Sequence, residues 1–192
     1  MNRKIQLRDW ILAALFVVLM SVSAGLKLPI PLVSITMQNL VVALAGLLMG
    51  PRMGALSMAV YLFMGLAGLP VFSTGGGIGY VLSPSIGYLV GFIPATALTG
   101  MLARKAPRTG RRPAFWALLL AVLAGMAVDY ILGVAGLYAV LNLAKGTPTA
   151  LLKALQTGTV PFLIGDGIKS VVAATLAVIL IPVKERIWQN RK

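Results

Sequence analysis

Apolar residues follow one another in long runs along this chain, and short stretches rich in charge, proline or glycine separate the runs. Apolar runs of membrane length with few charges are typical of transmembrane helices. The pattern therefore predicts six spans, at residues 10–26, 38–50, 53–70, 84–103, 114–141 and 161–182. The sequence Gly50-Pro51-Arg52 predicts a tight turn between the second span and the third.

Two of these spans need a further argument. The first follows a basic start, as the core of a signal peptide does, but its apolar run is longer than such a core and five more spans follow, so we expect a retained helix. The second is short for a membrane crossing. We expect it to be tilted or to borrow residues from the preceding PIPLVSITM, whose prolines argue against a helix before Ser34.

The composition supports a membrane protein. The chain has 192 residues, of which 59% are hydrophobic and 11% are charged, and its mean hydropathy is +0.94. Soluble domains carry about 25% charged residues, so this composition cannot supply a water-exposed surface. We predict an all-α integral membrane protein in which residues 1–192 form a single six-helix membrane domain.

The basic residues predict the orientation. The net charge is +13, but the basic residues cluster between apolar runs rather than on one face of a soluble fold, so we expect no nucleic-acid partner. Six spans place both termini on one side of the membrane. Thirteen Lys and Arg residues fall on that side and three on the other; the thirteen are Arg3, Lys4, Arg8, Arg52, Arg104, Lys105, Arg108, Arg111, Arg112, Lys184, Arg186, Arg191 and Lys192, and the three are Lys27, Lys145 and Lys153. This asymmetry predicts that both termini are cytoplasmic.

We interpret RKAPRTGRR, residues 104–112, as a topology determinant rather than as an anionic-lipid site.

The chain has no Cys and no His. This excludes disulfides, thiolate nucleophiles and imidazole bases, together with most transition-metal sites. We therefore expect no metal centre and no cofactor.

Two charges stand in the last predicted span, where a charge near the bilayer centre costs roughly 2.5–3.5 kcal/mol. Asp166 and Lys169 are three residues apart, so both lie on one face of a helix. They form either a structural ion pair or, as is usual for ionisable residues inside a membrane, a functional site. A carboxylate accepts hydrogen bonds and an ammonium donates them. The pair therefore suits a neutral polar ligand with both N–H and C=O groups, such as an amide, a urea or a lactam.

The glycine run in STGGGIGY, residues 73–80, is a second candidate on the outer side. It is not a nucleotide-binding P-loop, because no Lys followed by Ser or Thr is present. Gly75, Gly76 and Gly77 let the backbone approach a ligand closely, and their N–H groups suit an anion. A turn of low complexity explains the same residues equally well.

Asp129 is a third charge, near the middle of the fifth span. It either pairs with Lys169 or is protonated because it is desolvated. Two aspartates on adjacent spans also suggest an intramembrane aspartyl protease. The Tyr-Asp and Gly-x-Gly-Asp motifs of those enzymes are not matched, because the order here is Asp129-Tyr130 and Leu163 stands two residues before Gly165.

Several stretches resemble one family. The stretch GLAGLPVFSTGGGIGYVLSPSIGYLVGF, residues 65–92, is similar to the signature of BioY proteins, the biotin-specific S components of energy-coupling factor (ECF) transporters. The preceding VSITMQNLVVALAGLLMGPRMGALSMAVYLFMG and the later VPFLIGDGIKSVVAATLA follow the same pattern. The resemblance covers the chain from the first span to the sixth.

The resemblance implies capture of biotin from the outer side of a bacterial inner membrane, with no enzymatic activity. In the family, an Asp and a Lys at this spacing in the last helix contact biotin. Asp166 would then accept from the ureido N–H groups and Lys169 would donate to the ureido carbonyl. We expect the apolar part of biotin to pack on Tyr80, Tyr88 and Phe72.

The carboxylate of biotin needs hydrogen-bond donors. The candidates are the backbone of Gly75, Gly76 and Gly77, the side chain of Gln38, and Lys27.

The resemblance also implies partners, namely a transmembrane coupling protein and two ATPase subunits, and this chain carries no Walker motif of its own. Two features depart from the family. Pro84-Ser85 replaces the usual Pro-Thr, and the first helix lacks the Ala-x-x-x-Ala docking pattern, although Ser21 and Gly25 are small residues at that spacing.

Two rival functions remain. One is an S component for another small vitamin, in which only the pocket would differ; a metal-specific member is disfavoured by the absence of His and Cys. The other is a self-sufficient secondary transporter with Asp129 or Asp166 as proton carrier, for which we find no inverted repeat.

Overall fold

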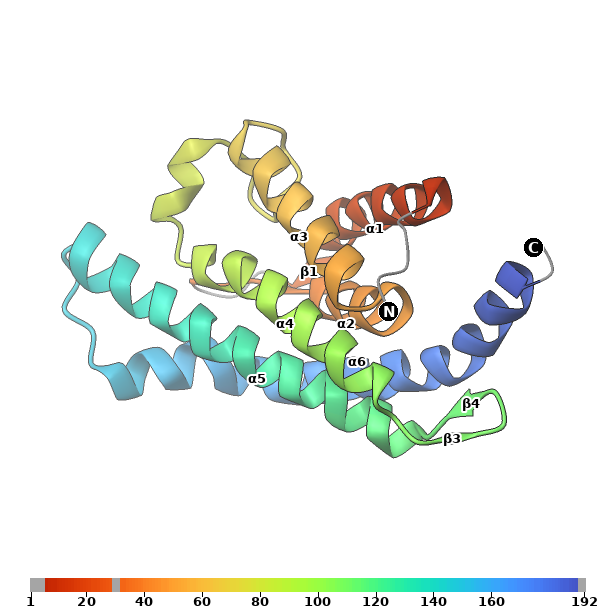
Figure 1. Cartoon of the computed structure of the whole chain (residues 1–192). Helices are drawn as coiled ribbons and strands as arrows, with labels where there is room; N and C mark the ends of the chain where they lie inside the picture. Colours follow the sequence, from red (N-terminus) through yellow and green to blue (C-terminus); the bar gives the residue numbers. More distant parts are fainter. Residues whose placement is uncertain (1–5, 29–31, 190–192) are drawn as a thin grey trace.

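A computed structural model of the chain describes residues 6–28 and 32–189 and shows a mainly helical protein (Figure 1). The helices, in chain order, are α1 (Leu7–Gly25), α2 (Gln38–Met49), α3 (Pro51–Leu66), the 3₁₀ helix η1 (Ile78–Leu82), α4 (Ile86–Arg104), α5 (Phe115–Ala139), the π-helical turn η2 (Val140–Ala144) and α6 (Leu151–Gln189). Two short antiparallel strand pairs join helices: β1 (Lys27–Leu28) with β2 (Ile35–Thr36), and β3 (Arg108–Thr109) with β4 (Arg112–Pro113).

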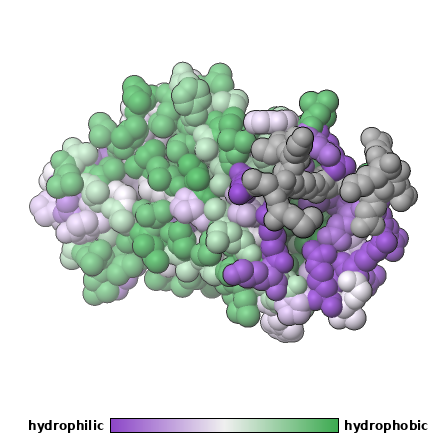
Figure 2. Space-filling model, viewed as in Figure 1, coloured by the Kyte–Doolittle hydropathy of each residue, from purple (hydrophilic) through white to green (hydrophobic). Residues whose placement is uncertain are grey.

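The surface of the bundle confirms a membrane protein. Within the described residues, four helical stretches are long and apolar enough to cross a membrane, at Leu7–Gly25, Ile86–Arg104, Phe115–Ala144 and Leu151–Ile187. Helix α2 is apolar but shorter. Figure 2 shows hydrophobic residues over most of the visible surface and hydrophilic ones gathered at one end, over the β3–β4 hairpin and the end of α6. An apolar surface of this extent needs lipid around it.

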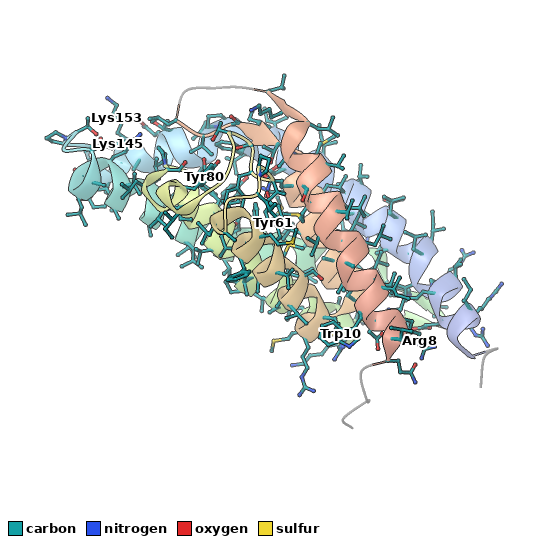
Figure 3. The ribbon with its side chains drawn as sticks, turned by 90° about the horizontal axis from the view of Figure 1, so that it is seen from above. Arg8, Trp10, Tyr61, Tyr80, Lys145 and Lys153 are labelled. Carbon is teal, nitrogen blue, oxygen red and sulfur yellow. The ribbon has the colours of Figure 1, made fainter. Side chains whose placement is uncertain are left out.

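Basic residues that the sequence assigns to opposite sides of the membrane lie at opposite ends of the bundle. Figure 3 shows Arg8 and Trp10 at one end and Lys145 and Lys153 at the opposite end. This arrangement agrees with the division of charge expected from the sequence. Four residues of that division, Arg3, Lys4, Arg191 and Lys192, lie outside the described residues, as do Pro29 and Pro31.

Gly50 forms the turn between α2 and α3. Its φ of 79° is in the left-handed region, and its N–H donates to the Gly46 carbonyl at 2.9 Å, which ends α2. Pro51 then occupies the first position of α3, where a missing N–H has no cost. The turn predicted at Gly50-Pro51-Arg52 is confirmed.

Helix α6 extends beyond the predicted span at both ends. It begins at Leu151 rather than at Pro161, so the segment expected to be an outer loop before Pro161 is partly helical. Pro161 and Pro182 both lie inside the helix. Membrane helices tolerate proline because neighbouring groups satisfy the freed backbone. Figure 1 shows α6 bending near its C-terminal end.

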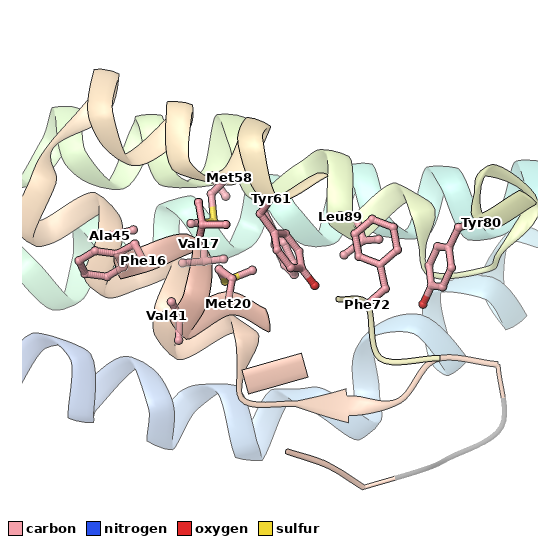
Figure 4. Close-up of a cluster of buried hydrophobic side chains, with 13 residues drawn as sticks. Phe16, Val17, Met20, Val41, Ala45, Met58, Tyr61, Phe72, Tyr80 and Leu89 are labelled. Atoms are coloured by element: carbon pink, nitrogen blue, oxygen red, sulfur yellow. The ribbon is translucent and has the colours of Figure 1, made fainter. Parts of the chain in front are cut away.

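A row of aromatic rings connects the core to the outer loop. The ring of Phe72 lies 5.4 Å from that of Tyr61 and 4.6 Å from that of Tyr80, centroid to centroid (Figure 4). Phe72 belongs to the α3–α4 connection, and Gly65 on α3 makes room for its ring, because a Cβ there would come within 2.0 Å of it. The core therefore anchors the loop that carries the glycine run.

Candidate functional site

A pocket lies where α2, α4, α5 and α6 meet the two connections that contain β1–β2 and the glycine run. Its polar lining comes from Ser34, Thr36, Gln38, Asn39, Ser73, Ser85 and Asp166. Its aromatic lining comes from Tyr80, Tyr88, Phe92, Tyr130 and Phe162. A lining that combines aromatic rings with convergent polar side chains suits a small organic molecule that has both polar and apolar parts.

Asp166 is the charged group at the wall of this pocket, and only 2% of it is exposed. Its Oδ2 accepts hydrogen bonds from Asn39 Nδ2 at 2.7 Å and from Tyr130 Oη at 2.6 Å. Its Oδ1 accepts from Lys169 Nζ at 2.8 Å. Donors from three helices therefore hold the carboxylate in one orientation, which a buried charge requires.

Lys169 forms an ion pair with Asp166, one helical turn along α6, which is one of the two alternatives left open by the sequence. Its Nζ also donates to the Thr36 carbonyl at 2.5 Å, which ties α6 to β2. Lys169 is 9% exposed and is not part of the pocket lining. The structural and functional interpretations of this pair are thus compatible, because the same contacts that hold the pair also place Asp166 at the wall.

The aromatic candidates take different positions. Tyr80 and Tyr88 line the pocket, whereas Phe72 stands behind Tyr80 in the core. The hydroxyl of Tyr88 donates to the Gly158 carbonyl on α6 at 2.6 Å. Gly133 on α5 leaves room for its ring, since a Cβ there would come within 2.2 Å of the ring atoms. Tyr88 is therefore fixed at both its ring and its hydroxyl.

Two of the three backbone donors predicted for a ligand carboxylate, those of Gly75 and Gly77, already have partners within the protein. The N–H of Gly75 donates to the Phe72 carbonyl at 3.3 Å, and that of Gly77 donates to the Gly65 carbonyl at 2.7 Å. Both glycines have a positive φ, 122° and 103°, so the run forms a defined turn. Gly76 lies against the Leu69 carbonyl, which a Cβ would approach within 2.1 Å. None of the three glycines is among the residues that line the pocket.

The two side-chain donors predicted for the ligand carboxylate, Gln38 and Lys27, also have hydrogen-bond partners within the protein. Gln38 lines the pocket, but its Nε2 donates to Tyr61 Oη at 2.9 Å and its Oε1 accepts from Thr36 Oγ1 at 3.0 Å. Lys27 donates to the Ser73 carbonyl at the pocket edge. The roles given to these donors in carboxylate binding remain predictions.

Comparison with known proteins identifies the family. The sequence model of the BioY family matches residues 1–186. This chain belongs to the BioY family. The biotin transporter BioY of Thermotoga maritima is 36% identical over 172 residues, which cover 89% of this chain and 94% of that protein. The biotin transporter BioY of Rhizobium etli is 37% identical over 177 residues, which cover 88% of this chain and 90% of that protein.

A solved structure extends the likeness to three dimensions. The chain is similar to the crystal structure of the S component for biotin from an ECF-type ABC transporter, with a TM-score of 0.77, 26% sequence identity and 94% of each chain covered. The BioY-like stretch at residues 65–92 spans the end of α3, the glycine run and the first part of α4. In the structure this stretch supplies Ser73, Tyr80, Ser85 and Tyr88 to the pocket.

Two partners of Asp166 were missed from the sequence of this BioY protein. Asn39 follows the predicted Gln38 at the start of α2, where a polar pair opens an apolar run. Tyr130 follows Asp129 on α5. Both residues can be picked out in the sequence as polar groups beside a candidate residue. Their neighbours in the sequence do not show that they contact Asp166, which lies 127 residues from Asn39 and 36 residues from Tyr130.

Asp129 does not pair with Lys169, whose hydrogen bonds go to Asp166 and Thr36. Asp129 is 3% exposed and lines a separate pocket of about 230 Å³ between α2, α4 and α5. Among the described residues, its Oδ1 has no hydrogen-bond partner. Asn39 lines both pockets, so it stands between Asp129 and the site at Asp166.

Proposed function

We propose that this BioY protein is the substrate-binding membrane subunit that captures biotin from the outer side of the membrane for ATP-driven uptake by an ECF-type transporter. One observation carries the proposal: a buried carboxylate with an ion-paired lysine borders a pocket lined by aromatic rings in a chain whose relatives are named biotin transporters. The protein is not an enzyme. Biotin is its cargo, and it uses no cofactor.

The chemistry of biotin suits the pocket. The ureido ring has N–H donors and a carbonyl acceptor. Asp166 accepts from an N–H, and Lys169 supplies a donor to the carbonyl when its ammonium turns from the Thr36 carbonyl toward the pocket. Tyr88 and Tyr80, the latter with Phe72 behind it, give the sulfur ring and the aliphatic chain apolar surface.

The carboxylate of biotin lies toward Ser73 and the pocket edge in this proposal. The proposed donors are Gln38, which lines the pocket, and Lys27, which donates to the Ser73 carbonyl. The backbone of Gly75, Gly76 and Gly77, which follow Ser73 in the sequence, is the third proposed donor. Gln38, Lys27 and the N–H groups of Gly75 and Gly77 have partners within the protein, so binding through any of these exchanges one hydrogen bond for another.

We further propose that α2 and α3 cross the membrane together with the four longer helices, which gives six spans in one domain over residues 1–192 and places both termini in the cytoplasm. The positive-inside rule supports this orientation, because Arg8 lies at the end rich in basic residues and Lys145 and Lys153 lie at the other (Figure 3). Tyr80 stands nearer to the end with Lys153, so the pocket opens toward the outside of a bacterial inner membrane.

Energy for uptake comes from partners in this proposal. The sequence has no Walker motif, so a transmembrane coupling protein and ATPase subunits supply ATP hydrolysis. A small helical bundle with closely packed glycines suits rigid-body movement against such a partner.

The test is calorimetric titration of biotin into the detergent-purified protein. We expect tight binding to the wild type, and a loss on the order of 2–5 kcal/mol for Asp166→Asn or Lys169→Met, because each leaves a buried charged partner unpaired. Lys153→Met removes a charge from the exposed start of the same helix and serves as the matched control. Equal effects of all three substitutions would refute the pocket assignment.

The same preparation separates the alternatives. Folded wild-type protein that binds another vitamin but not biotin would indicate a different specificity. Uptake driven by a proton gradient in vesicles without partner subunits would indicate a secondary transporter.

A further inference from the structure

Tyr61 on α3 is fully buried and is not among the residues that line the pocket at Asp166, yet its hydroxyl contacts two segments that form that pocket. Gln38 at the start of α2 donates from its Nε2 to Tyr61 Oη at 2.9 Å. Tyr61 Oη in turn donates to the Val71 carbonyl of the α3–α4 connection, also at 2.9 Å. The hydroxyl therefore lies between two walls of the pocket.

A chain of polar contacts connects Gln38 to the ion pair on α6. Gln38 Oε1 accepts from Thr36 Oγ1 at 3.0 Å, and the Thr36 carbonyl accepts from Lys169 Nζ at 2.5 Å. Lys169 is itself paired with Asp166. The chain thus runs from α6 through β2 and α2 to Tyr61, which extends it to the α3–α4 connection.

The two ends of the Thr36–Gln38–Tyr61 network fix the direction of its hydrogen bonds. The Val71 carbonyl can only accept, so Tyr61 donates to it and accepts from Gln38. The backbone N–H of Gln38 can only donate, and it donates to Thr36 Oγ1 at 3.3 Å, which leaves the Thr36 hydroxyl hydrogen for Gln38 Oε1. The Gln38 amide therefore has one orientation in this network, and the Tyr61 hydroxyl is the partner that holds its Nε2.

The wall on the other side of Tyr61 is the α3–α4 connection, which brings Ser73 and Tyr80 to the pocket. The ring of Phe72, which follows Val71, packs between the rings of Tyr61 and Tyr80 (Figure 4). Tyr80 Oη also lies 3.3 Å from Ser73 Oγ. Because these contacts connect the residues of the connection to one another, the position of Val71 influences the position of Tyr80.

The link through Tyr61 is buried, whereas another link to the same connection is exposed. Lys27 donates to the Ser73 carbonyl at the surface, where water competes for both groups. Gln38 and Tyr61 are 4% and 0% exposed. Loss of a partner there leaves a buried donor unsatisfied, which is the more costly case. The buried link is therefore expected to hold the two walls together more strongly.

We propose that Tyr61 is a positioning residue of the biotin site, whose hydroxyl joins the wall made by α2, β2 and α6 to the wall made by the α3–α4 connection and thereby slows the release of bound biotin. This inference rests on the proposed function. Tyr61 acts through Gln38 and Val71 rather than by contact with the ligand. Differences in affinity among variants of one site lie mainly in the dissociation rate constant, so the effect is expected there.

A purely structural role for the Tyr61 hydroxyl predicts a different result. Loss of a buried hydrogen bond then lowers the melting temperature, while biotin leaves the folded protein at the wild-type rate. Tyr61→Phe separates the two roles, because it keeps the ring that packs at 5.4 Å from Phe72, centroid to centroid, and removes only the hydroxyl.

The experiment measures the release of tritiated biotin from detergent-purified protein after excess unlabelled biotin is added, well below the melting temperature of every variant. We expect at least about fivefold faster release from Tyr61→Phe, as for the loss of a buried hydrogen bond. Ser57→Ala is the matched control. Ser57 is also fully buried on α3, one turn before Tyr61, and its hydroxyl donates to the Met53 carbonyl of the same helix at 2.8 Å. We expect Ser57→Ala to release biotin at the wild-type rate.

A double-mutant cycle tests whether Tyr61 acts through the chain of contacts. Gln38→Met keeps a side chain of similar length and removes its hydrogen bonds, so the chain is already broken. In that background we expect Tyr61→Phe to change the release rate by less than about twofold. Thr36→Val breaks the chain at its next link and serves if Tyr61→Phe does not fold; we expect faster release from this variant as well.

Three outcomes would count against the proposal. Equal release rates in Tyr61→Phe and Ser57→Ala, or effects of Gln38→Met and Tyr61→Phe that multiply in the double variant, would overturn it. Tight binding by the wild type with unchanged release from Tyr61→Phe and Thr36→Val would refute this inference and leave the proposed function standing. Folded wild-type protein that binds no biotin would refute the proposed function and this inference with it.

Discussion

Asn39 and Tyr130 reach the same oxygen of Asp166 from two different helices, while Lys169 reaches the other. A buried carboxylate is tolerated because these donors replace water. The site therefore depends on residues that carry no charge themselves, and substitutions at the neutral partners test it as well as substitutions at the charged pair do.

Asn39→Asp should damage the site strongly. The substitution replaces a donor 2.7 Å from Asp166 Oδ2 with a second carboxylate, and two like charges at that distance in a buried place repel each other. We expect a lower melting temperature and at least about tenfold weaker biotin binding, a loss of the size seen for a hydrogen bond to a charged group.

Gln156→Glu is the control for Asn39→Asp, because Gln156 is exposed on α6 and its substitution adds the same negative charge. Differential scanning fluorimetry and calorimetric titration measure the two effects. Unchanged biotin affinity in Asn39→Asp would show that Asn39 does not support the binding site.

Sequence reasoning found the residues that are unusual in themselves. Asp166 and Lys169 are conspicuous because they are charged within an apolar run. Their spacing places both on one helix face, and the ion pair that the structure shows is one of the two alternatives left open by the sequence. Asn39 and Tyr130 are ordinary residues at helix positions, and only tertiary packing brings them to Asp166. The glycine run is a distinctive pattern, but in the structure it forms a turn whose N–H groups donate to Phe72 in the same loop and to Gly65 at the end of α3.

At the scale of the elements, α4 and α5 pack against each other through glycines. A Cβ on Gly136 would lie 2.5 Å from the backbone of Gly87, and a Cβ on Gly87 would lie 2.4 Å from the Leu132 carbonyl. Two helices can approach this closely only where both lack side chains. The approach also positions Tyr88, the next residue on α4, against the pocket.

Gly136→Ala should therefore force α4 and α5 apart. We expect a loss of about 1–3 kcal/mol in stability, the usual range for overpacking, visible as a lower melting temperature in detergent. Gly165→Ala on α6 is the control, because a Cβ there meets no described atom within 4 Å and alanine favours a helix. A melting temperature of Gly136→Ala equal to that of the control would contradict the close packing.

The apolar run of α6 does not show where the helix begins. The sequence predicts that the last span begins at Pro161, because proline is favoured in the first turn of a helix. The structure instead continues the helix back to Leu151. Tyr88 donates to the Gly158 carbonyl in the turn before Pro161, a contact from another helix that no local pattern contains.

At the scale of the whole molecule, the uneven distribution of basic residues supports one orientation in the membrane. The chain has no Cys, so single cysteines can be introduced without a background. Lys145 and Arg111 are both exposed and are predicted to lie on opposite sides. Their accessibility therefore tests the proposed orientation directly.

We expect a membrane-impermeant maleimide to label Lys145→Cys in intact cells and to label Arg111→Cys only after the membrane is opened. Equal labelling of both variants in opened membranes is the control for reactivity. Labelling of Arg111→Cys in intact cells, with Lys145→Cys protected, would reverse the orientation and place the pocket on the cytoplasmic side.

Asp166 offers about four lone-pair positions, and three are already filled by the protein's own donors. A ligand that arrives with two N–H groups finds one vacancy, so its second N–H must displace a resident donor. Recognition at this carboxylate is therefore largely a substitution reaction, in which a polar contact adds little net free energy when it forms. Removing Asp166 or Lys169 costs more than this, because a buried charge is then left unpaired. Most of the affinity must then come from the aromatic walls, and two ligands with the same polar head will be distinguished by the shape of the part that touches them.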